Sequence, residues 1–181
     1  VAADATHIPR VPRYTHVRRR AACPLPAAPS HLDASVDPGI AYVAKVVGLA
    51  YLVAQLEWLI IDDIRLATSS IDALDLHGQP TGAIGRALVR VVPELTSRPN
   101  VQHFVATSAR ALLNVAARRN TVLHARPATQ KSGEVRLLKL RVGKAGEVDG
   151  TWIDDAYLDK QISAVKYWLR RVESARELPL D

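Results

Sequence analysis

The segment Arg119-Asn120-Thr121-Val122-Leu123-His124 combines side chains that together can act on a phosphate ester. A histidine titrates near neutral pH and serves as an acid or a base. An arginine presents a rigid fork of donors to phosphate oxygens. Cleaving RNA without a metal needs a base for the ribose 2′-OH, an acid for the leaving 5′-oxygen and positive charge on the phosphorane. One copy of the segment supplies the charge but only one proton-transfer group.

The spacing of arginine and histidine is not specific by itself, so the context must select the pair. The same spacing also occurs at Arg10/His16, Arg98/His103 and Arg118/His124. The first of these pairs lies in a proline-rich stretch without a helical pattern, and Pro99 interrupts the second. Arg119/His124 has a polar Asn120 after the arginine and ends a long amphipathic stretch in the most basic part of the chain. We therefore take Arg119 and His124 as the candidate catalytic pair.

This segment resembles the motif of the HEPN superfamily, in which an arginine, commonly followed by a polar residue, is separated from a histidine by four to six intervening residues. The resemblance covers about residues 38–177 and implies a metal-independent endoribonuclease built as a helical bundle. It implies a homodimer in which two motifs face each other across a cleft. Arg119 would then stabilise the phosphorane, His124 would act as acid or base, and Asn120 would orient them. Nearby Arg118 and Arg126 would hold the RNA backbone.

The same resemblance implies a cytoplasmic toxin–antitoxin or phage-defence protein, with RNA and an antitoxin or another defence protein as partners. Some members carry a modifiable tyrosine two residues after the histidine, where this chain has Arg126, so that route of control is not expected here. Many HEPN domains have lost activity. The alternative is therefore a catalytically silent helical module that binds nucleic acid or a partner protein.

Other residues that carry chemistry have plain structural interpretations. Asp62 and Asp63 are adjacent and point about 100° apart on a helix, so we expect a solvated helix end rather than a catalytic pair. Asp154-Asp155 is typical of a helix cap. With a single cysteine, Cys23, no multi-cysteine metal site is possible. Four histidines lie in predicted loops or the N-terminal segment without a partner at helical spacing: His7, His16, His31 and His77. We expect no metal and no cofactor.

Charge is unevenly distributed along the 181 residues. The net charge is +6, but residues 86–144 carry +10, and the blocks 38–85 and 145–181 carry −3 each. A polyanion such as nucleic acid is the natural partner of the central block. A solvated arginine-rich face is the alternative interpretation of the charge alone.

The hydrophobic pattern predicts an all-α fold of four to five bundled helices, with a small β-hairpin insert near residues 134–153. Residues 1–37 are rich in proline and arginine and are expected to form an extended arm, which leaves 38–181 as the domain. The expected helices are one that Asp37 caps and Pro38 begins, running to Leu66; one over Thr81–Val92; one that Asn100 caps, ending before Pro127; and one from about Asp154 to Glu177. Residues 67–80 are expected to form a loop.

The stretch Ile40–Leu66 is apolar on nearly every side and is long enough to span a bilayer. Lys45, Gln55 and Glu57 lie within it, so a central buried helix is the preferred interpretation and a membrane span the alternative. In the other helices, the positions expected to face the core are Ile84, Leu88, Val91, Val101, Phe104, Val105, Leu112, Val115, Ala116, Leu158, Ile162, Val165, Leu169 and Val172.

Overall fold

The computed structural model describes residues 37–143 and 146–177, so the predicted arm, apart from Asp37, lies outside the described residues. The elements are α1 (Ile40–Ala67), α2 (Ala73–Leu76), α3 (Thr81–Val91), a 3₁₀ turn (Val92–Leu95), α4 (Pro99–Leu123), β1 (Arg126–Thr129), β2 (Val135–Val142), β3 (Val148–Ile153) and α5 (Asp155–Arg176). Five α-helices and one small sheet within the described ranges confirm the predicted helical fold with a hairpin insert.

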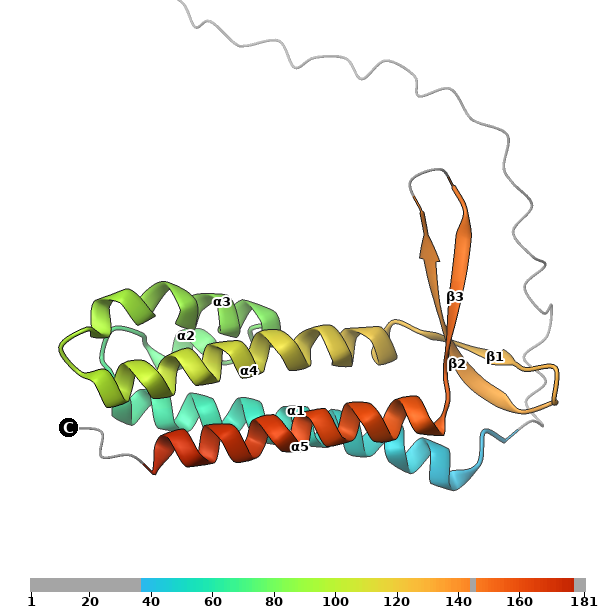
Figure 1. The fold of residues 1–181 in the computed structure, drawn as a ribbon, viewed down its shortest axis with the longest axis horizontal. Coiled ribbons are helices and arrows are strands. Elements are labelled where there is room, and N and C mark those ends of the chain that lie inside the picture. The colour runs from blue at the N-terminus through green and yellow to red at the C-terminus, as the bar shows by residue number, and fades with distance from the viewer. Residues whose placement is uncertain (1–36, 144–145, 178–181) are drawn as a thin grey trace, which may run out of the picture. The chain divides into compact units, whose positions relative to one another are not determined.

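The three long helices α1, α4 and α5 pack against one another, and α3 packs on α4 (Figure 1). Gly85 lets α3 and α4 approach closely, since a Cβ at that position would lie 2.9 Å from the Leu113 Cγ. The core positions predicted outside α1 are all buried except Ile162, which is half-buried. A fully buried leucine or phenylalanine contributes about 1.5–3 kcal/mol, so these stripes hold the bundle together.

The start of α1 differs from the prediction. Asp37 and Pro38 precede the helix, and Gly39 stands before Ile40 with a positive φ of 81°. The Asp37 Oδ1 accepts a hydrogen bond from the Gly39 N–H at 2.9 Å instead of capping the helix. The left-handed backbone at Gly39 breaks the path from Pro38 into α1, which is why Pro38 is not the first helical residue.

Two further boundaries need correction. Asn100 does not cap α4, because the helix already begins at Pro99, whose fixed φ suits a first helical position. The loop predicted over residues 67–80 contains the short helix α2, where the Asp72 side chain accepts from the Leu74 N–H at 2.8 Å. The cap predicted at Asp154 is confirmed, since its Oδ1 accepts from the Tyr157 N–H at 2.7 Å.

The sheet lies at the end of the bundle where α4 stops and α5 begins (Figure 1). Its strands are antiparallel in the order β1-β2-β3. The predicted hairpin is formed by β2 and β3, and β1 is an addition that the sequence pattern did not indicate. β1 pairs with the first half of β2 only, from Val135 to Leu138, so the far half of the hairpin projects as two strands.

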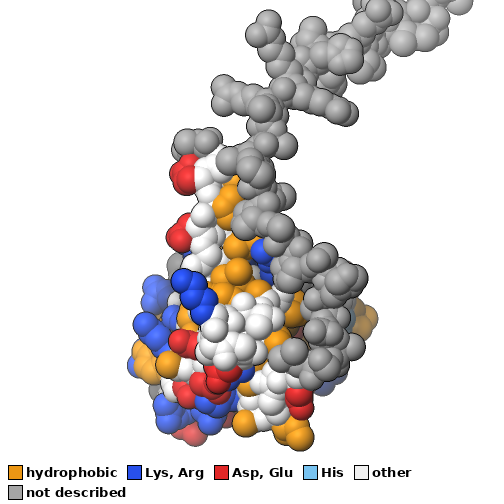
Figure 2. All heavy atoms as spheres, turned by 90° about the vertical axis from the view of Figure 1, so that its right-hand side faces the viewer, with side chains coloured by type: hydrophobic (Ala, Val, Ile, Leu, Met, Phe, Trp, Pro, Cys, Tyr) orange, Lys and Arg blue, Asp and Glu red, His pale blue; other side chains and the backbone are white. Residues whose placement is uncertain are grey.

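Alternation along the hairpin gives it two different faces. Leu137 opposes Ile153, and both pack on the helices, so Lys139 and Arg141 lie on that same face. The opposite face carries Arg136 at its base and is apolar along the rest of the hairpin, with Leu138, Leu140, Val142, Val148 and Trp152. Hydrophobic side chains are visible along the projecting hairpin in Figure 2.

The central buried helix that the sequence predicted is buried on one face only. Leu56, Ile60 and Ile64 are in the core, but Val43 and Val47 are exposed. With α4, α5 and α2 packed on it, α1 keeps an uncovered side. By length and composition alone, α1 is long and apolar enough to cross a membrane, and it is the one such helix among the described residues.

The solvated helix end expected at Asp62 and Asp63 holds for Asp62 but is wrong for Asp63. The Asp63 side chain is buried between α1 and the end of α5, where its Oδ2 lies 3.1 Å from the Arg176 Nε. The reason is tertiary: α5 covers this turn of α1, which no local pattern in α1 records.

Candidate functional site

The helix that carries the predicted motif contains no acidic residue. α4 holds Arg110, Arg118 and Arg119 over its 25 residues, and the chain has no aspartate or glutamate between Glu94 and Glu134. Within the described residues, no carboxylate lies within ion-pair distance of any of these three arginines. The second half of α4 is therefore a positively charged element whose charge is not neutralised inside the fold.

The motif occupies the last turns of α4. Asn120 and His124 are exposed, and Arg119 is half-buried. The Arg119 Nη1 lies 3.5 Å from the Asn120 Oδ1, a contact at the limit of hydrogen bonding. The helix ends at Leu123, and His124 takes a non-helical backbone with φ −100° and ψ 9°. The ending before Pro127 that the sequence predicted is confirmed.

The structure does not bring Arg119 and His124 together within one chain. α4 stays regular through Leu123, so five residues separate the two side chains by about 140° around the helix axis. Among the described residues, no side-chain hydrogen bond joins Arg119 or Asn120 to His124; the His124 N–H donates to the Asn120 carbonyl at 3.1 Å as part of the helix end. One chain therefore presents the histidine and the arginine on different sides of the same helix end.

Arg118, predicted to contact RNA, is held inside the protein. Its Nε donates to the Asn114 Oδ1 at 2.7 Å, and its Nη1 donates to the Gln161 Oε1 at 2.6 Å. Gln161 is buried in α5, so Arg118 connects α4 to α5. Two of its donor groups are used in this way, and its RNA contact stays a prediction.

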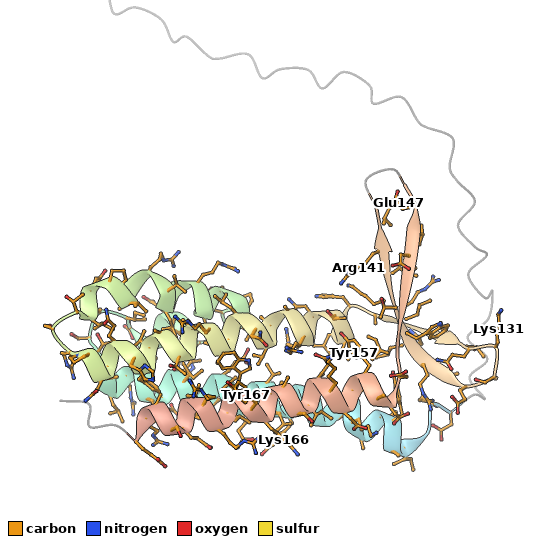
Figure 3. The ribbon with its side chains drawn as sticks, in the orientation of Figure 1. Lys131, Arg141, Glu147, Tyr157, Lys166 and Tyr167 are labelled. Atoms are coloured by element: carbon orange, nitrogen blue, oxygen red, sulfur yellow. The ribbon has the colours of Figure 1, made fainter. Side chains whose placement is uncertain are left out.

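Arg126, the other predicted RNA contact, is exposed on β1. It opposes Leu138, which in turn opposes Trp152, so these three side chains form one row across the sheet. Arg126 thus lies on the apolar face of the hairpin and not on the face of Lys139 and Arg141. Figure 3 shows Arg141 on the projecting hairpin and Lys166 and Tyr167 along α5.

An open hollow of about 580 Å³ lies over α4 and α5 beside Arg118. Its lining residues are Arg110, Leu113, Asn114, Ala117, Arg118 and Trp168. The hollow combines an apolar floor with two guanidinium groups at its edge. In helical phase, His124 lies within about 40° of Arg110 and Ala117, so the α4 face that borders the hollow leads to the histidine.

Sequence reasoning missed the role of Trp168 and the bond from Arg118 to Gln161. The spacing of Arg110, Asn114 and Arg118 at four-residue intervals marks one face of α4 and could have drawn attention to it. Nothing in the local sequence places Trp168 or Gln161 against that face, because both belong to α5. Among residues 37–143 and 146–177, no group of three or more His, Cys, Asp or Glu side chains is arranged to hold a metal ion.

No protein-family model matches the chain, and neither a curated protein nor a solved structure shows a significant match to it. The candidate site therefore depends on its own residues and their geometry.

Proposed function

We propose that this protein is an endoribonuclease of the HEPN type that needs no metal ion, with Arg119 and His124 as its catalytic residues. The observation that carries the proposal is the end of α4, where an exposed histidine and an arginine that pairs with no carboxylate of the described residues occupy the last turns of an acid-free helix. Positive charge without a counter-ion favours a phosphate ester as the bound group.

The reaction is a transesterification. A base removes the proton of the ribose 2′-OH, and the 2′-oxygen forms a bond to phosphorus. The bond from phosphorus to the 5′-oxygen breaks, and an acid protonates that oxygen. The products are a 2′,3′-cyclic phosphate and a free 5′-OH. His124 of one copy removes the 2′-OH proton, the His124 of the partner subunit protonates the leaving 5′-oxygen, and Arg119 stabilises the charge on the phosphorane.

A second copy of the chain completes the site. Because Arg119 and His124 point about 140° apart, the histidine of one copy meets the arginine of the other more readily than its own. Asn120 lies between them on the same turn and orients the arginine. A toxin or phage-defence role, with an antitoxin or another defence protein as partner, is the setting that the HEPN resemblance suggests.

The test is cleavage of structured RNA in excess EDTA, with the end groups of the products identified. We expect the wild-type protein to leave 2′,3′-cyclic phosphate ends, and His124→Ala and Arg119→Ala to lose cleavage. His103→Ala and Arg65→Ala are matched controls, since both side chains are exposed and lie away from the motif. Equal cleavage by the wild type and His124→Ala would overturn the assignment.

Mixing the wild type with His124→Ala tests the shared site. If the cleft needs the His124 of both copies, only dimers of two wild-type copies are active, and these are a quarter of the dimers in a randomly exchanged equimolar mixture. The activity should then fall to about a quarter of that of the same total amount of wild type. A mixture that keeps half of that activity after subunit exchange would contradict a site that combines the two histidines.

The second candidate function is a silent module that binds RNA without cutting it. It is favoured by one observation, the use of Arg118 as a link between α4 and α5 beside the hollow lined by Trp168. Aromatic and arginine side chains together suit single-stranded nucleic acid. RNA binding without cleavage of tRNA, rRNA or mRNA would support this candidate and reject the enzyme.

A further inference from the structure

One face of α1 is apolar, and no described element covers it over most of the helix. Its residues follow the alternating spacing of four and three of a heptad repeat: Ile40, Ala44, Val47, Tyr51, Ala54 and Trp58. The four large side chains are exposed, at 83% for Ile40, 60% for Val47, 69% for Tyr51 and 54% for Trp58. We call these six residues the α1 stripe.

No charged residue belongs to the α1 stripe. The two charged residues between Ile40 and Trp58 lie off the stripe and are paired with other elements. The Lys45 Nζ lies 3.0 Å from the Asp155 Oδ1 and 2.9 Å from the Asp159 Oδ2, and Glu57 accepts a hydrogen bond from the Thr81 hydroxyl. A continuous apolar surface of this length marks an interaction site, because leaving it in water costs free energy.

The spacing of the stripe specifies what covers it. A period of 3.5 residues keeps a seam in contact with another helix at a shallow crossing angle, as in coiled coils. We propose that the α1 stripe pairs with the same stripe of a second copy of this chain, with the two helices antiparallel.

The side chains match in size when the stripe is paired with itself in reverse. A two-fold axis near Leu49 places Ile40 opposite Trp58 of the partner subunit, Ala44 opposite Ala54, and Val47 opposite Tyr51. Gly48 and Ala50 then lie beside the axis, one on each side of the stripe, and a Cβ added at Gly48 would find no atom within 4 Å in the single chain. Small residues at the axis let the two backbones approach closely.

Charge favours the antiparallel direction. The first turn of α1 has no acidic residue, and Gly39 provides no side-chain cap. Asp62 is exposed one turn beyond Trp58 on the same side of the helix, and no described cation lies within 4 Å of it. Arg65 is also exposed on this side of the helix, three residues farther along. In a parallel pair each of these two charges would lie beside the same charge of the other helix, which is unfavourable, whereas in the antiparallel pair the like charges lie at opposite ends.

This contact is separate from the one that would complete the ribonuclease site. His124 lies at the end of the bundle where α1 begins. The stripe spans about 27 Å from Ile40 to Trp58, and antiparallel pairing puts the two N-terminal ends of α1 at opposite ends of that span. The pairing therefore keeps the two His124 side chains apart, and it does not depend on the proposed enzyme activity.

The first test is the mass of the full-length protein in solution by sedimentation or light scattering. We expect Tyr51→Glu to halve the mass of the assembly, whether from four copies to two or from two to one. Val89→Glu is the matched control, since it adds the same charge at an exposed apolar position on α3 and should leave the mass unchanged. An unchanged mass for Tyr51→Glu, or a wild type that stays monomeric at micromolar concentration, would overturn the proposal.

The second test is disulfide trapping in a Cys23→Ser background. Val47→Cys and Tyr51→Cys proteins are mixed and oxidised, and the cross-links are identified by mass spectrometry. Antiparallel pairing predicts that cross-links between residues 47 and 51 dominate. Cross-links of each residue only to itself would show a parallel pair, and flotation of the wild type but not Tyr51→Glu with phosphatidylcholine vesicles would show that lipid covers the stripe. Either result would overturn the proposal.

Discussion

At the scale of single residues, Asp63 shows how the bundle alters the chemistry of one group. Burial raises the pKa of this carboxyl above its ordinary value of 3.8; Arg176 opposes the shift and Asp62 adds to it. Its Oδ2 receives no properly directed hydrogen bond from any described residue, although the Arg176 Nε lies 3.1 Å away. The folded state therefore favours the protonated form of Asp63 more than the unfolded chain does.

The raised pKa of Asp63 determines whether its contribution to the free energy of unfolding rises or falls with pH. Because the pKa of Asp63 is higher in the folded state, its contribution makes the free energy of unfolding fall as the pH rises from 3.8 through the raised pKa. Asp63→Asn removes that contribution. We expect the variant to gain stability relative to the wild type between pH 3.5 and pH 7, measured by urea unfolding at several pH values. Asp75→Asn, at an exposed position, is the control, and a relative stability of Asp63→Asn that does not change with pH would contradict the prediction.

Arg118 and Arg119 are neighbours, but we expect their replacement by alanine to lower the stability of the fold by different amounts. Arg118→Ala leaves the buried Gln161 amide without its partner, and an unsatisfied buried polar group costs about 1–3 kcal/mol. Within the part of the chain that the structure describes, Arg119 makes one side-chain hydrogen bond, the long contact to Asn120, so Arg119→Ala should change stability by less than about 0.5 kcal/mol. Chemical unfolding of both variants checks the difference. Equal losses would mean that the link from α4 to α5 is not a stabilising contact.

At the scale of elements, Tyr42 joins α1 to the sheet. Its hydroxyl donates to the Ile153 carbonyl at 2.7 Å and accepts from the Leu137 N–H at 3.1 Å. The Arg136 guanidinium lies 4.6 Å from the ring centroid, and burial raises the pKa of the Tyr42 hydroxyl above 10.0. The hairpin thus has a fixed base on the bundle, while its far half has no covering element among the described residues.

Tyr42→Phe tests the connection that the Tyr42 hydroxyl makes between α1 and the sheet. The substitution keeps the ring and removes both hydrogen bonds, leaving a backbone carbonyl and an N–H unpaired in a buried place. We expect a loss of about 1–3 kcal/mol in the free energy of unfolding and faster hydrogen exchange at the Leu137 amide. Tyr51→Phe is the control for losing a tyrosine hydroxyl at an exposed position of the same helix. A loss confined to the control would contradict the assigned role.

At the scale of the whole molecule, positive and negative charges are concentrated on different elements. The sequence block 86–144 holds a net charge of +10, and α4 contributes cations without acids. Acidic side chains form ion pairs that join α1, α5 and the sheet. Asp155, for example, pairs with Lys45 and with Arg136. Hydrogen bonding to Lys45 is the main reason that the pKa of Asp155 lies below 3.8. The surplus positive charge is therefore left for an external polyanion.

This surplus predicts a strong salt dependence. If Arg110, Arg118, Arg119 and Arg126 each neutralise one phosphate of single-stranded RNA, affinity should fall about 50-fold between 50 and 200 mM salt. Filter binding at several salt concentrations measures the slope. Arg110→Ala should reduce the slope by one phosphate, while Arg90→Ala on α3 should not. A salt-independent affinity would remove the electrostatic basis for RNA as the partner.

The sequence by itself determined the elements and the local chemistry. Heptad-like and alternating apolar patterns predicted the long helices and the hairpin, because burial of one face imposes its period on the chain. The end of α4 before Pro127 followed from the restriction that a proline places on its predecessor. Gly39 at positive φ and Pro99 as the first residue of α4 moved the helix starts by a few residues, because several neighbouring residues were equally suitable as caps.

Only the tertiary structure decided which polar groups are used inside the fold and which apolar ones are left outside. Asp63 met Arg176, and Arg118 met Gln161, because α5 packs along α1 and α4. The α1 stripe stayed exposed because α2, α4 and α5 leave one side of α1 uncovered. These contacts join residues far apart in the chain, and their partners depend on how the helices pack. A local pattern records that a side chain is apolar or charged, but not which element will meet it.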